Sequence, residues 1–267
     1  MAVITITSDY GLKDHYVAAL KGALYRELEN PLIVDVTHQI QSFNITEAAF
    51  ILRNAYIHFP KGSVHLICVD EDGLQDHSHL VMKMNDHIFI AANNGVLSML
   101  NPDVKPDVMV EVDLRNAPEI ESARDIFARV AGHLLRGGKP EILGRVVSEY
   151  KKASLPNPTV KEDGKFIIGT VIYIDRYGNL VTNITKRLVN EVRKGRQMRL
   201  MLTKGRKPIN KILGHYYEEN EEGKAIAVYN AAGHIEIAIF KSGSDTFGGA
   251  SDLLGMRVND HINLEFV

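Results

Sequence analysis

Val64-His65-Leu66-Ile67-Cys68-Val69 is a nearly unbroken apolar segment close to the middle of the first half of the chain. Its apolar side chains do not alternate with polar ones, so both faces of a strand formed here would be apolar. Such strands are typical of sheets that are covered on both sides by helices. The segment therefore predicts a central strand of an α/β sheet.

Strand and helix patterns alternate on both sides of this segment. Asn44 and Glu47 fit a helix capping box, which predicts the start of a helix that continues through 48–56. Asn85-Asp86 predicts the turn of a hairpin. Other strands are expected at 5–8, 32–36, 79–84, 87–91 and 108–112, and other helices at 14–28 and 124–136. We expect an N-terminal α/β domain over residues 1–152, with a mostly parallel sheet and flanking helices.

A second domain is expected after a polar segment rich in helix and strand breakers. Residues 153–165 contain Pro156, Pro158 and Gly164, which is typical of a linker. Strand patterns then dominate, at 166–174, 198–202, 224–229, 235–240 and 258–267, with one predicted helix at 188–192. Residues 166–267 are therefore predicted to form a small all-β antiparallel domain that resembles a barrel.

The composition of the chain excludes several classes of function. The 267 residues include 31 Lys and Arg against 33 Asp and Glu, which does not favour nucleic-acid binding. The N-terminus has no signal-peptide pattern and no apolar run is long enough to cross a membrane, so we expect a cytoplasmic protein. Cys68 is the single cysteine, and the 11 histidines show no ligand spacing, so no metal site is expected. The glycine and nucleophile motifs of nucleotide-binding proteins and serine hydrolases are absent.

Polar residues gather where four predicted strands end, and open α/β sheets bind ligands at such ends. The first is Ser8-Asp9-Tyr10-Gly11, where Asp9 is either a ribose-binding carboxylate or an ordinary turn residue. The second runs from Asp35 through His38, which we interpret as structural, to Phe43. The remaining two, 69–73 and 174–183, are consistent either with a site or with solvated turns.

The ordered series of these segments resembles the S-adenosyl-L-methionine (SAM) hydroxide adenosyltransferase family, which is related to the SAM-dependent fluorinases and chlorinases. The resembling segments are Thr7-Ser8-Asp9-Tyr10-Gly11, Asp35-x-Thr37-His38-x-Ile40, Phe59-Pro60-x-Gly62-Ser63-Val64-His65, Asn93-Asn94-Gly95, Arg124-Asp125-Ile126-Phe127, Asp175-x-Tyr177-Gly178-Asn179-Leu180-x-Thr182-Asn183-Ile184 and Asn230-x-x-Gly233-x-Ile235-Glu236-Ile237-Ala238. They occur in the family's order and span nearly the whole chain.

The resemblance implies a homotrimer in which SAM lies between the N-terminal domain of one subunit and the C-terminal domain of its neighbour. It implies SAM as the substrate, with no separate cofactor and no metal. Asp9 would hold the ribose hydroxyls, and Phe43 would pack against the ligand. The remaining substrate-binding residues would be Asn94, Asp175, Tyr177, Asn179, Tyr217 and Asn230. In this mapping the two tyrosines flank adenine or ribose, Asp175 and Asn179 meet the methionine ammonium, and Asn230 lies near the methionine carboxylate.

The catalytic residues depart from the family's pattern. In the hydrolases of the family an Asp, an Arg and a His position and deprotonate water. Asp70 matches the Asp, but His77, or His79 in a shifted turn, stands where the Arg is expected, and Ser122 stands where the His is expected. As a histidine, His77 could act as a general base near neutral pH, and a surface position on a hairpin is equally open. The candidate catalytic residues are thus Asp70, His77 and Ser122.

Three functions remain open on the sequence. The first is attack of water or hydroxide at the ribose C5′ of SAM, giving adenosine and L-methionine. The second is a catalytically silent SAM- or adenosine-binding protein. The third is transfer of the adenosyl group to another nucleophile.

Overall fold

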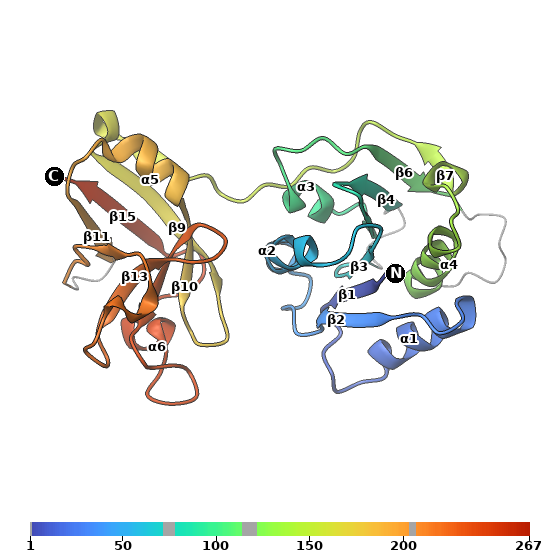
Figure 1. Cartoon of the computed structure of the whole chain (residues 1–267), viewed down its shortest axis with the longest axis horizontal. Coiled ribbons are helices and arrows are strands. Elements are labelled where there is room, and N and C mark those ends of the chain that lie inside the picture. The colour runs from blue at the N-terminus through green and yellow to red at the C-terminus, as the bar shows by residue number, and fades with distance from the viewer. Residues whose placement is uncertain (1, 72–77, 114–121, 203–206) are drawn as a thin grey trace. The chain divides into compact units, whose positions relative to one another are not determined.

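The computed structural model describes residues 2–71, 78–113, 122–202 and 207–267. The chain divides into two compact units, Met1–Ser154 and Leu155–Val267, and each has its own sheet and apolar core (Figure 1). No helix in the described ranges is long and apolar enough to cross a membrane.

The elements of the N-terminal unit are β1 (Ile4–Ser8), α1 (Tyr16–Glu27), β2 (Ile33–Thr37), α2 (Ile45–Ala55), η1 (Tyr56–His58), β3 (Val64–Cys68), β4 (His79–Met84), β5 (His87–Ala92), α3 (Val96–Leu100), β6 (Val108–Val112), α4 (Ala123–Leu135), η2 (Pro140–Ile142) and β7 (Gly144–Val146). The elements of the C-terminal unit are β8 (Thr159–Lys161), η3 (Glu162–Gly164), β9 (Phe166–Ile174), β10 (Leu180–Thr185), α5 (Lys186–Arg193), β11 (Met198–Leu202), β12 (Ile212–Leu213), η4 (Tyr216–Glu218), β13 (Ala225–Tyr229), β14 (His234–Ile239), α6 (Ala250–Leu254) and β15 (His261–Phe266).

The sheet of the N-terminal unit is mixed. Its described strands follow the order β2-β1-β3-β5-β4-β6-β7. The pairs among β2, β1, β3 and β5 are parallel, whereas β4, β6 and β7 pair antiparallel. The prediction of a mostly parallel sheet is therefore correct for one half only. The physical reason is the hairpin of β4 and β5, since a strand that returns through a two-residue turn must run antiparallel.

Helices cover both faces of this sheet, as the apolar segment 64–69 predicts. Helices α1 and α4 pack on one face, where Leu20 and Phe127 join a core with Ile4 and Leu66 (Figure 1). Helices α2 and α3 pack on the other face through a second core, which contains Leu52, Leu97, Ile67 and Phe89. Strand β3 thus carries buried side chains on both faces, and its five residues are fully buried.

Two local predictions are confirmed by the geometry. The Asn44 side chain accepts a hydrogen bond from the Glu47 backbone N–H at 3.1 Å, which caps α2. Asn85 and Asp86 both have positive φ angles, 53° and 62°, as the tight turn between β4 and β5 requires.

The C-terminal unit is also mixed. Its described strands follow the order β11-β15-β9-β10-β14-β13-β12, with β8 paired to β9. The pairs are antiparallel except β12 with β13, which is parallel. Helices α5 and α6 contribute Val189, Ala250 and Leu254 to its core, so the prediction of an all-β antiparallel domain is too simple.

Candidate active site

Three of the predicted site residues follow neighbouring parallel strands at one edge of the N-terminal sheet. Asp9 follows β1, Asp70 follows β3 and Asn94 follows β5. The strands β1, β3 and β5 are adjacent, and Ser8 lies opposite Cys68 in the register. The topology therefore brings these three residues to the same edge, which is where open α/β sheets bind their ligands.

Asp9 and Phe43 are joined directly. The backbone N–H of Phe43 donates to Asp9 Oδ2 at 2.8 Å. Phe43 has a left-handed backbone, with φ at 63°, and its side chain is 72% exposed. A bulky residue in this conformation is strained, which is a common property of ligand-binding loops. Asp9 Oδ1 has no hydrogen-bond partner in the described part of the chain, so it is free to accept hydrogen bonds from a diol.

Asn94 uses both polar atoms of its side chain in hydrogen bonds to the backbone. Its amide Nδ2 donates to the carbonyl oxygens of Val69, at 3.0 Å, and Asp70, at 3.2 Å. Its Oδ1 accepts the N–H of Val96 at 3.1 Å. Asn94 therefore fixes the end of β3, on which Asp70 adopts a φ angle of 51°. Its geometry fits support of Asp70 better than the direct substrate contact expected from the sequence.

Ser122 serves as the cap of α4. Its side chain accepts from the backbone N–H of Asp125, and its hydroxyl donates to Asp125 Oδ2 at 2.7 Å. Partial burial raises the pKa of the Asp125 carboxyl, but the bonds from Ser122 and Arg124 outweigh burial and lower it below the usual range. No hydrogen bond joins Ser122 to Asp70, although both residues are described. His77 lies outside the described residues. His79, the alternative to it, begins β4 and packs edge-on against Phe127.

A series of polar side-chain contacts begins at Ser8, the residue before Asp9. Ser8 Oγ lies 2.7 Å from His38 Nδ1, and His38 Nε2 lies 3.1 Å from Asp35 Oδ1. Lys21 Nζ lies 2.6 Å from the other oxygen of Asp35. Burial raises the pKa of Asp35, but the bonds from Lys21 and His38 outweigh it and lower that pKa. Ser8 is fully buried, so this series of contacts is a support and not a nucleophile that a substrate can reach.

Glu71 adds a buried carboxylate beside Asp70. The Tyr10 hydroxyl donates to Glu71 Oε1. Glu71 is only 8% exposed, and Cys68 next to it is fully buried. Burial raises the pKa of the Cys68 thiol well above its usual value, and the Glu71 charge raises it further.

The C-terminal unit gathers three other predicted residues into one cluster. Asn179 Nδ2 donates to Asp175 Oδ2 at 3.0 Å and to Glu236 Oε1 at 3.2 Å. Asn230 Nδ2 donates to Glu236 Oε2 at 3.2 Å. The backbone N–H groups of Tyr177 and Asn179 donate to Asp175 Oδ1. The turn before β10 and the turn before β14 are thus joined through side chains.

Glu236 is the residue that the sequence did not single out. It lies in a resembling segment, but an acidic residue in a strand gave no reason to assign it to the site. Burial raises the pKa of its carboxyl, and hydrogen bonds from Asn230 and Asn179 only partly offset this burial and the charge of Asp175.

The two predicted tyrosines of this unit present aromatic surface to solvent. Tyr177 is 67% exposed and Tyr217 is 79% exposed. Tyr217 packs edge-on against Tyr216 and Phe240, with ring centroids 5.2 Å and 6.1 Å away. Exposed aromatic side chains of this kind suit stacking on a flat heterocycle.

Comparison with known sequences settles the family. The model of the SAM hydroxide adenosyltransferase N-terminal domain matches residues 4–144, and that of the C-terminal domain matches residues 169–263. The chain belongs to the SAM hydroxide adenosyltransferase family. It is 27% identical to a protein of Thermus thermophilus named (R)-S-adenosyl-L-methionine hydrolase, over 96% of this chain and 97% of that protein. It is 24% identical to the fluorinase of Nocardia brasiliensis, over 88% of this chain and 89% of that enzyme.

A solved structure has a similar fold along nearly the whole chain. An uncharacterized conserved protein from Thermotoga maritima is 29% identical and has a TM-score of 0.84. The similarity covers 98% of this chain and 99% of that one. The similarity of this structure therefore includes residues of both units.

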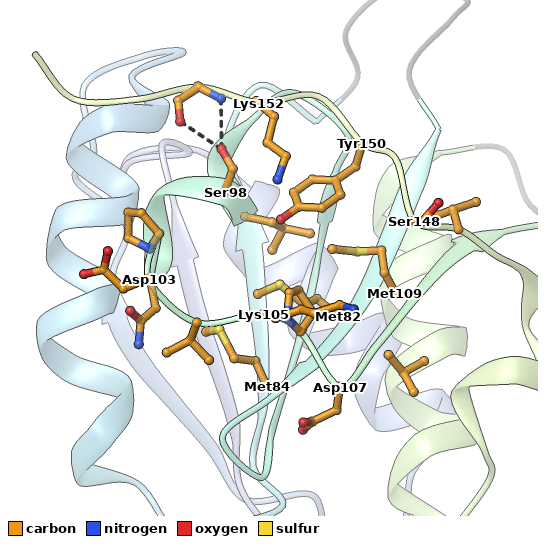
Figure 2. A pocket seen from close by; sticks show the side chains of 18 of the residues that line it. Met82, Met84, Ser98, Asp103, Lys105, Asp107, Met109, Ser148, Tyr150 and Lys152 are labelled. Atoms are coloured by element: carbon orange, nitrogen blue, oxygen red, sulfur yellow. Dashed lines mark hydrogen bonds between the residues drawn. The ribbon is translucent and has the colours of Figure 1, made fainter.

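The N-terminal unit contains a cavity of about 740 Å³. Met82, Met84 and Met109 line it together with Tyr150 and Lys152 (Figure 2). None of the predicted site residues lines it. In the described residues no group of three His, Cys, Asp or Glu side chains is arranged to hold a metal ion.

Proposed function

We propose that this protein hydrolyses SAM to adenosine and L-methionine. Membership of the SAM hydroxide adenosyltransferase family and the similarity to proteins named SAM hydrolases support this activity. The observation that carries it is the position of Asp70 at the end of β3, where Asn94 binds its backbone carbonyl; the family resemblance implies that this carboxylate handles the attacking water.

The substrate-binding roles are those that the family resemblance implies, and the free Asp9 Oδ1 and the exposed rings of Phe43, Tyr177 and Tyr217 support them. Asp9 accepts hydrogen bonds from the ribose diol through Oδ1, and Phe43 packs on the ligand. Tyr177 and Tyr217 flank the adenosyl group. Asp175, Asn179 and Asn230 bind the methionine end of SAM.

The reaction is a nucleophilic substitution and needs no oxidant or reductant. A water oxygen attacks C5′ of the ribose from the side opposite sulfur, the C5′–S bond breaks, and its electron pair stays on sulfur. The positive sulfonium thereby becomes the neutral thioether of methionine. Asp70 orients the water and takes its proton, which then passes to solvent. Alignment of the two reacting atoms contributes roughly 7–11 kcal/mol to such a step.

The altered catalytic residues favour a specific second candidate, a SAM-binding protein that does not turn over. Ser122 is engaged as the cap of α4, so its hydroxyl is a weak substitute for a histidine base.

A third candidate function is transfer of the adenosyl group to a nucleophile other than water. We further propose that the protein is a homotrimer, as the family resemblance implies, and that it is cytoplasmic, as its sequence leads us to expect.

The test is to incubate the purified protein with SAM and to quantify adenosine and methionine by chromatography. Because the similar hydrolases are named for the R epimer at sulfur, the (R) and (S) epimers are assayed separately. Equal amounts of adenosine and methionine are expected, above a control without protein. Bound but intact SAM would favour the silent binding protein, and acceleration by an added anion or thiol would favour another nucleophile.

Two matched variants test the role of Asp70. Asp70→Asn keeps the size of the side chain but removes its basicity, so we expect at least a 100-fold fall in kcat. Asp86→Asn is the control, since Asp86 lies at the exposed turn of the β4–β5 hairpin. Equal hydrolysis by wild type and Asp70→Asn would show that Asp70 does not handle the water.

A further inference from the structure

Glu236 is the point where the two polar turns of the C-terminal unit meet. It lies on β14, opposite Val181 of β10 and Val228 of β13. Strand β10 begins directly after the turn that carries Asp175 and Asn179, and β13 ends directly before Asn230. A side chain at position 236 can therefore reach both turns, and its two oxygens accept one hydrogen bond from each.

The carboxylate of Glu236 fixes the orientation of two amides. An ionised carboxylate is an acceptor only, so both asparagines must turn their NH2 groups toward it. Asn179 Nδ2 is then saturated, because its second hydrogen goes to Asp175 Oδ2 at 3.0 Å. Asn179 Oδ1 is left without a hydrogen-bond partner in the described ranges. Asn230 is held in the same way, since its Oδ1 accepts the N–H of His234 at 3.0 Å.

The hydrogen-bonding character of the resulting cluster is complementary to an ammonium group. It offers the Asn179 carbonyl oxygen beside two carboxylates, and an ammonium group has three donors and no acceptor. Neither Asp175 nor Glu236 forms an ion pair with a cationic side chain among the described residues. The neighbouring cation, Arg176, pairs with Asp245 at 2.9 Å instead.

We propose that Glu236 is a positioning residue that sets the amides of Asn179 and Asn230 and so makes this unit selective for the methionine end of SAM. The inference rests on the proposed function for the identity of the substrate. Glu236 acts through the two asparagines, and adenosine, which lacks the amino acid, does not depend on it.

The experiment compares the binding of SAM and of adenosine by calorimetry for wild type and Glu236→Gln. Glutamine has the same size, but its NH2 group faces an amide NH2, so at least one asparagine must flip. We expect the Kd for SAM to rise at least 10-fold and the Kd for adenosine to change less than twofold. In the hydrolysis assay KM should rise with little change in kcat. Glu191→Gln, on the exposed face of α5, is the matched control and should leave both affinities unchanged.

Two results would overturn the inference. Unchanged SAM affinity would show that Glu236 does not set the asparagines, and an equal loss of SAM and adenosine would show a general structural role. The binding readout does not need turnover. A wild type that binds SAM but does not cleave it would contradict the proposed hydrolysis and leave the result on Glu236 intact.

Discussion

The side-chain amide of Asn94, which follows β5, donates a hydrogen bond of 3.2 Å to the backbone carbonyl of Asp70, which follows the neighbouring strand β3. Asn94→Asp keeps the size of the side chain but removes both donors, and it places a second carboxylate beside Asp70. Loss of these bonds is expected to lower stability by about 1–3 kcal/mol. We also expect kcat for SAM hydrolysis to fall about 10-fold, because a misplaced catalytic group loses alignment. Thermal unfolding and steady-state kinetics measure the two effects, and Asn101→Asp is the control. Unaltered kcat in a folded Asn94→Asp protein would contradict the supporting role.

Phe43 combines a strained backbone with an exposed ring, and two variants separate these properties. Phe43→Ala removes the ring and keeps the strain, whereas Phe43→Gly removes both. The left-handed conformation costs a non-glycine residue roughly 1–2 kcal/mol, and the flexibility of glycine offsets about half of that. We expect the glycine variant to be about 1 kcal/mol more stable than the alanine variant in urea unfolding. Both should bind SAM more weakly than wild type to a similar extent, since both lack the ring. Wild-type affinity for SAM in either variant would show that the Phe43 ring does not contribute to SAM binding.

The buried pair of His65 and His87 predicts that the free energy of unfolding decreases at acidic pH. His65 Nε2 lies 3.0 Å from His87 Nδ1, and Thr5 Oγ1 lies 2.7 Å from His65 Nδ1. Burial, with the neighbouring His87, lowers the pKa of His65 to about 3, and burial lowers the pKa of His87. The native state thus binds fewer protons than the unfolded chain between pH 6.5 and 3. The stability conferred by the neutral imidazoles is present above pH 6.5 and is lost as the pH falls through this window.

The expected slope for one histidine is about 1.4 kcal/mol per pH unit below 6.5. Urea unfolding at pH 7.0, 6.0 and 5.0 measures it. His65→Asn should have a flatter profile than wild type, while substitution of the exposed His58 by Gln should keep the wild-type profile. Parallel profiles for His65→Asn and wild type would show that another group controls the acid dependence.

The carboxylate of Glu236 is expected to favour SAM binding but to lower the stability of the folded protein at neutral pH. Burial and the charge of Asp175 raise the pKa of its carboxyl, so the folded protein favours the protonated form more than the unfolded chain does. Stability linked to this group is therefore greatest below the usual pKa of glutamate and decreases as the pH rises through the raised value. Glu236→Gln has no charge to bury, so its melting temperature at pH 7 should equal or exceed that of wild type. A clearly lower value at pH 7 would mean that the two asparagine bonds outweigh the burial of charge.

Patterns of neighbouring residues predicted the elements well, whereas long-range pairing was harder to predict. The unalternating segment 64–69 placed β3 at the centre, and the pair Asn44 and Glu47 placed the start of α2. The direction of β6 and β7 depends on which edge the β4–β5 hairpin joins, and no local pattern encodes that choice. The short strand β12 and helix α6 carry too few residues for a periodic signal.

The same distinction applies to the site. Asp9, Asp70 and Asn94 follow predicted strands, so their shared edge was predictable from topology. Hydrogen-bond partners were not, because they depend on side-chain orientation across strands. Asn94 therefore binds backbone, and Glu236 receives both asparagines, without any signal in its own segment.

The single sulfhydryl of the chain has a consequence for how the protein responds to oxidants. Cys68 ends β3 two residues before Asp70, it is fully buried, and its pKa is raised by burial and by Glu71. Thiolates, not thiols, react with peroxides and alkylating reagents. We therefore expect Cys68 to stay reduced and unmodified as long as the N-terminal unit is folded, so that its reaction with iodoacetamide would report unfolding of the strand that precedes Asp70.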